Sequence, residues 1–172
     1  MKSNSITKES LVTALFQLMK EKPFKDIKIK EIIERSGVSK VSYYRNFKSK
    51  EDILNSYMLY ETSKFHELHN GEEERVFLIH LFEHLSNFKV VFDLLYKNHL
   101  SYIFSEHVYE WCGPKENAED SNAYLQSAIA YSVFGFLDEW IRRGMKGSPE
   151  ELADDLIKDL NGFPIKINHL KF

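Results

Sequence analysis

A sharp break between two short amphipathic patterns, close to residue 37, constrains the fold of this chain more than any other feature. Ile29, Ile32 and Ile33 fall at helical spacing and form one apolar stripe, which stops at Ser36-Gly37. Glycine readily adopts the positive φ that a sharp reversal after a helix requires. The pattern therefore predicts a helix that ends at this glycine, followed directly by a change of chain direction.

A second short helix is predicted immediately after the turn. Ser39 is placed to cap it, and Val38, Tyr43 and Phe47 supply an apolar inward face. A helix is about 10–12 Å across and the major groove of B-DNA is about 12 Å wide, so an exposed polar face can reach base edges. Two helices joined in this way indicate a helix-turn-helix, although similar units occur in proteins that never touch DNA. The outward face of the second helix and the residues after it carry Lys40, Ser42, Tyr44, Arg45, Asn46, Lys48 and Lys50.

The charges of the chain are unevenly distributed along the sequence. The first 50 residues carry twelve Lys and Arg against five Asp and Glu, whereas the remainder carries eleven against twenty-one, for a net charge of −3. A basic end attracts phosphates, and an acidic body is repelled by the same duplex. Because the cations lie in and around the helix pair, this distribution favours nucleic-acid binding over a solvated lysine-rich surface without a partner.

Composition indicates a globular protein and argues against a membrane protein. The chain has 172 residues, of which 43% are hydrophobic and 28% charged. No apolar run approaches the ~18 residues of a membrane span, and the N-terminal sequence lacks the apolar core of a signal peptide. A single cysteine, Cys112, agrees with a reducing compartment. We therefore expect a cytoplasmic protein with no membrane partner.

Helical patterns cover the rest of the chain, and almost nothing indicates a strand. The predicted helices span about 7–20, 51–70, 72–87, 88–98, 99–111, 121–143 and 149–161. Ser148, Pro149 and Glu151 form a strong helix start, with serine as N-cap and proline at the first helical position. We predict an all-α fold with a three-helix, helix-turn-helix DNA-binding domain at 1–50 and a helical ligand-binding and dimerisation domain at 51–172.

The segment KIKEIIERSGVSKVSYYRNFKSKEDIL resembles the DNA-binding domain of TetR/AcrR-type (tetracycline-repressor-like) bacterial transcriptional regulators. Their pattern is a helix followed by roughly IA..AGVS.gt.Y.hF.sKe.L, and the match spans about residues 6–54. The segment GFLDEWIRRGMKGSPEELADDL is similar to the effector and dimerisation domain of a subgroup that includes regulators of dihydroxyacetone kinase operons. The sequence departs from the first pattern at Ile33, Ser36, Val41-Ser42 and Asn46. It matches the pattern at Gly37, Val38, Ser39, Tyr44, Phe47, Lys48, Lys50 and Leu54.

The resemblance implies a ligand-responsive, sequence-specific repressor whose partner is double-stranded operator DNA. By this resemblance, base edges or neighbouring sugars would be contacted by Lys40, Ser42, Tyr44 and Asn46, with Arg45 beside them. Phosphates would be held by Lys30, Lys48, Lys50 and the backbone N–H groups at the Ser39 helix start.

Tight operator binding by so small a unit implies a homodimer, which we expect to form through the last two helices. The same apolar stripes also suit an internal core. The expected surface combines Tyr124, Ile129, Val133, Phe136, Leu137, Trp140 and Ile141 with Leu152, Leu156, Ile157 and Leu160, and the small residues Ala128 and Gly135 would permit close contact. A small apolar or aromatic effector is a further expected partner, because aromatic residues are frequent in the C-terminal part, although such residues also simply fill cores.

Two short strings favour an enzyme and are outweighed. His80 to His84 reads H-x-x-E-H, as in some zinc peptidases, and His66 and His69 are near in sequence, yet solvated helix faces explain all four histidines. Trp111-Cys112-Gly113-Pro114 is similar to a thioredoxin motif without its second cysteine. We expect no catalytic residue, no metal and no cofactor. The remaining alternative is a dimeric helical co-regulator that senses or recruits a protein partner.

Overall fold

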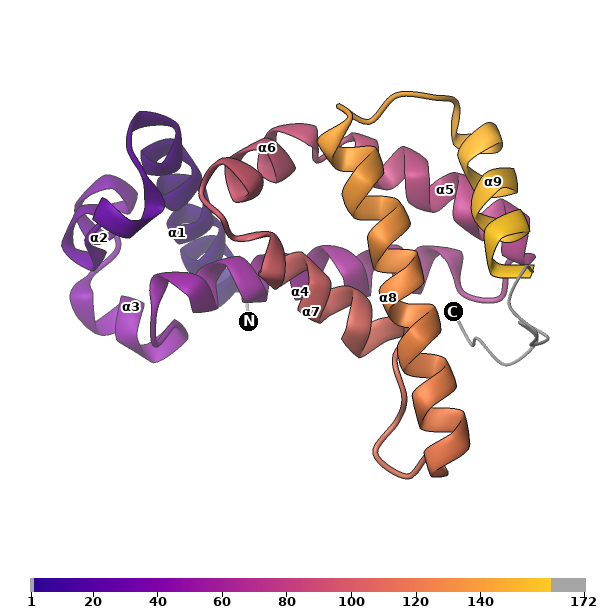
Figure 1. Cartoon of the computed structure of the whole chain (residues 1–172). Helices are drawn as coiled ribbons and strands as arrows, with labels where there is room; N and C mark the ends of the chain where they lie inside the picture. Colours follow the sequence, from indigo (N-terminus) through magenta and orange to yellow (C-terminus); the bar gives the residue numbers. More distant parts are fainter. Residues whose placement is uncertain (1, 162–172) are drawn as a thin grey trace. The chain divides into compact units, whose positions relative to one another are not determined.

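The computed structural model describes residues 2–161, which form nine α-helices and one 3₁₀ helix and contain no strand (Figure 1). The prediction of an all-α fold is thus confirmed. The elements are α1 (Lys2–Glu21), η1 (Phe24–Asp26), α2 (Ile29–Ser36), α3 (Lys40–Asn46), α4 (Lys50–His69), α5 (Glu74–Ser86), α6 (Lys89–Lys97), α7 (Ser101–Cys112), α8 (Asp120–Arg142) and α9 (Pro149–Asn161). Every helix in this part is too short or too polar to cross a lipid bilayer.

The described residues divide into two compact units. Unit 1 comprises residues 2–61 and 93–103, and unit 2 comprises residues 62–92 and 104–161. The sequence placed a domain boundary after residue 50, whereas the first part of α4 groups with α1–α3. The reason is packing, because Ile53 and Leu54 of α4 are buried and Tyr57 meets the ring of Phe16 edge-on at 5.1 Å between centroids.

Unit 1 is built around α1, whose inward stripe was correctly predicted. The buried side chains of α1 are met by Ile32 of α2 and Tyr43 of α3, both fully buried. The 93–103 segment joins this unit through Asn98, whose Oδ1 accepts a hydrogen bond of 2.6 Å from the backbone N–H of Phe24. The α1 residues that line this core are Leu11, Ala14, Leu15, Leu18 and Met19.

Unit 2 has a core shared by α5, α8 and α9, and α9 packs beside α5 (Figure 1). The side chain of Arg75 in α5 donates two hydrogen bonds, of 2.6 and 3.0 Å, to the carboxylate of Asp154 in α9. The predicted start of α9 is confirmed, since the Ser148 Oγ accepts from the Glu151 N–H at 3.2 Å while the Glu151 carboxylate accepts from the Ser148 N–H at 3.2 Å.

Most of the apolar stripe expected to form a dimer surface is instead internal core. Phe82 of α5, which is fully buried, meets the Trp140 ring edge-on at 5.1 Å and the Phe136 ring at 6.0 Å. Helical periodicity marks an apolar face without saying what covers it, so the sequence could not separate these two uses. The expected interface residues that are buried within the chain are Ile129, Val133, Leu137, Trp140, Ile141, Leu156 and Leu160.

Candidate nucleic-acid interface

The turn between α2 and α3 has the predicted geometry. Gly37 follows α2 with φ of +68°, the left-handed conformation in which a side chain would be strained. The Ser36 hydroxyl donates to the Ile33 carbonyl at 3.1 Å and accepts from the Val38 N–H at 3.2 Å. Ser36 stands where the family pattern has alanine, and its hydroxyl adds two hydrogen bonds that fix the turn.

The start of α3 is capped as the sequence predicts. The Ser39 Oγ accepts a hydrogen bond of 3.1 Å from the Ser42 N–H, and the two hydroxyl oxygens lie 3.0 Å apart. This contact satisfies an N–H group that the helix itself leaves unpaired. Both serine hydroxyls of the predicted surface are therefore partly engaged with each other at the first turn.

Two adjacent tyrosines of α3 point in opposite directions. Tyr43 is fully buried, as predicted, and its ring centroid lies 6.3 Å from that of Phe47 and 5.1 Å from that of Tyr44. Burial raises the pKa of Tyr43 to about 12, and its hydroxyl has no hydrogen-bond partner among residues 2–161. Tyr44, by contrast, keeps 53% of its surface exposed. One ring thus anchors α3 and the other is presented to solvent.

The exposed side of α3 groups one aromatic ring with three cations. Lys40, Tyr44, Arg45 and Lys48 are all exposed, whereas Asn46 is half-buried and its Nδ2 donates to the Ser42 carbonyl at 2.7 Å. This surface combines positive charge for phosphates with donors and a flat ring for base edges.

Val41 is an exposed apolar residue of α3 to which the sequence assigned no role. Its side chain is largely accessible on the first turn of the helix. An apolar side chain at such a position is suited to contact the methyl group of thymine. The signal was present in the sequence, because an apolar residue between Lys40 and Ser42 does not fit the inward face.

Lys50 has contacts that differ from the expected phosphates. Its Nζ donates to the carbonyl oxygens of Phe24 at 2.5 Å, Ile27 at 3.0 Å and Lys25 at 3.3 Å. The same atom lies 4.4 Å from the centroid of the Phe24 ring. The ammonium group therefore holds η1 against the start of α4, and a phosphate role for Lys50 stays a prediction.

Other cations of the basic N-terminal part are paired with carboxylates. Arg35 donates two hydrogen bonds, of 2.7 and 2.9 Å, to Glu21, and hydrogen bonding to Arg35 lowers the pKa of that carboxyl. Lys22 pairs with Glu31. Lys30 is highly exposed and lies 3.5 Å from Glu34, a surface pair that contributes little to stability. Among the expected DNA contacts, Lys40, Arg45 and Lys48 thus form the cationic group around α3.

The two enzyme-like strings do not form the sites that their patterns suggest. His84 packs between the rings of Phe65 and Phe88, at 4.8 Å from each, and burial lowers its pKa. Cys112 is buried, and burial raises the pKa of its thiol to about 12, which disfavours the reactive thiolate. His80 instead hydrogen-bonds to Glu72, a residue outside both strings.

A capped, exposed and cationic second helix on an all-α scaffold defines the class of helix-turn-helix DNA-binding proteins. Residues 11–57 match the family model of bacterial regulatory proteins, tetR family, and residues 68–162 match that of a transcriptional regulator C-terminal region. The chain belongs to the TetR family of bacterial transcriptional regulators, which are non-enzymatic DNA-binding proteins.

Solved structures agree on the fold. A TetR transcriptional regulator from Streptococcus agalactiae 2603V superimposes with a TM-score of 0.60 at 17% identity, covering 92% of this chain and 96% of that chain. The dihydroxyacetone kinase operon activator DhaS superimposes with a TM-score of 0.58 at 17% identity, covering 91% of this chain and 94% of that chain. A comparison with curated proteins found no match.

Proposed function

We propose that this regulator is a repressor that binds operator DNA in the cytoplasm as a homodimer and responds to a ligand. The observation that carries the DNA-binding role is the exposed, cationic face of α3 around Tyr44. Lys40, Tyr44 and Arg45 read base edges, with Ser42 and Asn46 beside them. Lys30 and Lys48 hold phosphates, together with backbone N–H groups at the Ser39 helix start.

The Lys48 contact with phosphate gives a prediction about salt. Lys48→Ala should weaken binding to all DNA sequences alike and lower the slope of log affinity against log salt by about 1, because one fewer counterion is released. Fluorescence anisotropy titrations at several salt concentrations measure this slope. Lys158→Ala, which removes an exposed lysine of α9, is the matched control and should leave the slope unchanged. Loss of affinity for one operator variant alone would show that Lys48 reads bases.

The dimer is proposed to form through the outward face of α8. Tyr124, Ala128, Tyr131 and Gly135 recur at helical spacing, and Tyr124 and Tyr131 are 72% and 60% exposed. A Cβ added at Gly135 would meet no atom within 4 Å, so this position is open for another helix to approach. Large exposed rings beside small residues favour close helix packing, and a two-fold dimer presents two α3 helices to two half-sites.

The dimer proposal predicts that Tyr131→Arg converts the protein into a monomer. Two arginines would meet near the two-fold axis, where like charges repel and lose hydration. Analytical ultracentrifugation measures the molar mass, and Val90→Arg in α6, another exposed apolar position, is the control. A Tyr131→Arg protein that sediments as a dimer would place the interface elsewhere.

The ligand response is proposed to reside in unit 2, where aromatic rings are concentrated. Phe77 lies between Phe65 and Trp111, with ring centroids 5.3 and 5.6 Å away. Rings of this kind suit an apolar or aromatic effector. Such a ligand changes operator affinity only if it binds the DNA-competent and incompetent conformations with different affinity.

The DNA-binding role is tested with the regulator's own upstream region. Sequence-selective anisotropy changes with this duplex, and much weaker ones with an unrelated duplex of equal length, are expected. Equal affinity for both duplexes would contradict an operator-specific regulator and favour the co-regulator that recruits a protein partner.

A further inference from the structure

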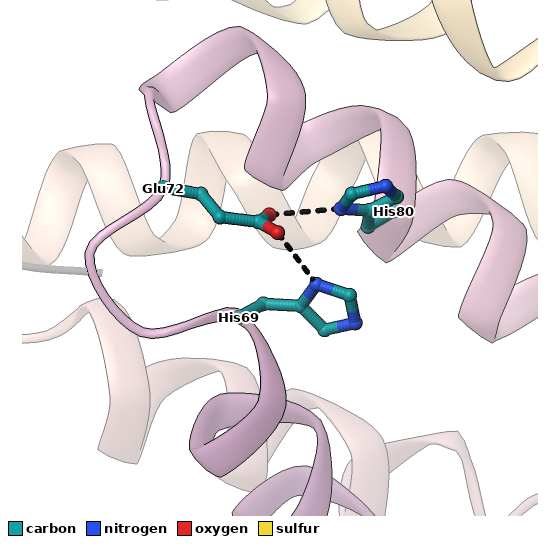
Figure 2. Close-up of side chains that lie close together, drawn as sticks. All are labelled: His69, Glu72 and His80. Carbon is teal, nitrogen blue, oxygen red and sulfur yellow. Dashed lines mark hydrogen bonds and ion pairs between the residues drawn. The ribbon is translucent and has the colours of Figure 1, made fainter.

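The connection between α4 and α5 brings two histidines and a glutamate together (Figure 2). His69 is the last residue of α4, Glu72 follows the turn at Gly71, and His80 lies in α5. The two Glu72 carboxylate oxygens lie 3.0 Å from the His69 Nδ1 and 2.8 Å from the His80 Nδ1. Figure 2 shows the carboxylate reaching both rings from one side.

These three side chains match the ligand chemistry of zinc. One ligand atom from each residue lies within 4.8 Å of the other two. Zinc binds imidazole nitrogen at about 2.0–2.1 Å and carboxylate oxygen at about 2.0–2.2 Å, so tetrahedral ligand atoms lie roughly 3.3–3.5 Å apart. Small side-chain rotations convert the present spacing into that one. Two histidines and one carboxylate also leave a fourth position for water.

We propose that His69, Glu72 and His80 form a binding site for a divalent zinc ion at the α4–α5 turn. The site is assembled within twelve consecutive residues of unit 2, so its geometry depends on one helical hairpin. The proposal rests on these side chains and does not depend on DNA binding.

The surroundings hold the two imidazole rings in place. The ring of the buried Phe65 lies 4.5 Å from that of His69, and the His69 and His80 rings are 4.5 Å apart. The side chains of His69, Glu72 and His80 are 23%, 27% and 35% exposed. An ion from solvent can therefore reach the site, while the rings already lie close to a coordinating arrangement.

Charge and proton balance favour the ion. Hydrogen bonds from His80 and then His69 keep the pKa of Glu72 below its usual value, so the group supplies a negative charge. When zinc binds, each coordinating ring nitrogen must present its lone pair. A proton on that nitrogen moves to the other ring nitrogen of a neutral imidazole or is released to solvent from a protonated one.

Isothermal titration calorimetry of the full chain, first stripped of metal with a chelator, tests the proposal. Zinc chloride is expected to bind with one ion per chain. Glu72→Gln keeps an acceptor for the histidines but removes the charge, and His80→Asn removes a ligand; each should weaken zinc binding by at least about tenfold. His99→Asn is the matched control, because it removes an exposed histidine of unit 1 and should leave binding unchanged.

Cobalt(II) provides a second readout that does not depend on any variant. Four-coordinate cobalt in the parent protein should give intense visible absorption, which zinc should abolish by displacing it. The absence of one-to-one zinc binding by the parent protein would overturn the proposal. Zinc binding with unchanged affinity in both Glu72→Gln and His80→Asn, folded by circular dichroism, would also overturn it.

Discussion

Replacing Tyr44 with alanine is expected to weaken operator binding by roughly tenfold to a hundredfold, the range of about 1–3 kcal/mol that a base-reading contact contributes. Tyr44 is 53% exposed, and its ring meets that of Tyr43 edge-on at 5.1 Å. Because its side chain fills no core, the helical content and oligomeric state should stay unchanged. Anisotropy titration against the operator, with circular dichroism as the fold check, measures both.

The neighbouring tyrosine supplies the matched control for this substitution. Tyr43→Phe removes a buried hydroxyl that has no partner within residues 2–161 and keeps the ring against Phe47. The variant should bind the operator as the parent does and be at least as stable, since an unpaired buried hydroxyl costs free energy. An unchanged operator affinity in Tyr44→Ala would contradict the proposed docking of α3.

Replacing Lys50 with methionine is expected to lower the free energy of unfolding by about 1.5–3 kcal/mol, the range for a hydrogen bond to a charged group. Methionine keeps much of the apolar stem but removes the donor shared by the carbonyls of Phe24, Lys25 and Ile27. Urea unfolding followed by circular dichroism measures this change.

Lys48→Ala is the comparison for Lys50→Met, because the Lys48 side chain is exposed and its removal should leave stability within about 0.5 kcal/mol of the parent. If Lys50→Met unfolded at the parent's urea concentration and instead lowered the salt slope of DNA binding, Lys50 would be a phosphate contact. The two lysines thus separate a structural cation from a DNA-binding one.

Local signals explain why the sequence predicted the helices so well. Each cap involves residues only a few positions apart, as in the Ser39 contact with Ser42 and the reciprocal contacts of Ser148 and Glu151. The inward direction of Tyr43 likewise follows from its spacing to Phe47. Such contacts depend on the chain's immediate neighbours, so a single sequence contains the information needed to predict them.

Contacts made by tertiary folding could not be predicted in the same way. The Lys50 ammonium meets carbonyls of residues 24–27, and backbone carbonyls leave no trace in a sequence pattern. Glu72 joins His69 and His80 because the turn at Gly71 reverses the chain, whereas the H-x-x-E-H string directed attention to His84. The stripes of α8 and α9 show the same limit, since core and interface share one periodicity.

The most direct test of the central claim is chemical protection of the operator. Dimethyl sulfate methylates guanine N7 in the major groove, where α3 is proposed to lie. We expect the parent protein to protect guanines in two patches whose centres are about 34–36 Å apart, or a multiple of that distance, and Tyr44→Ala to lose this protection. Full methylation of the major groove at protein concentrations that saturate the operator would contradict the account.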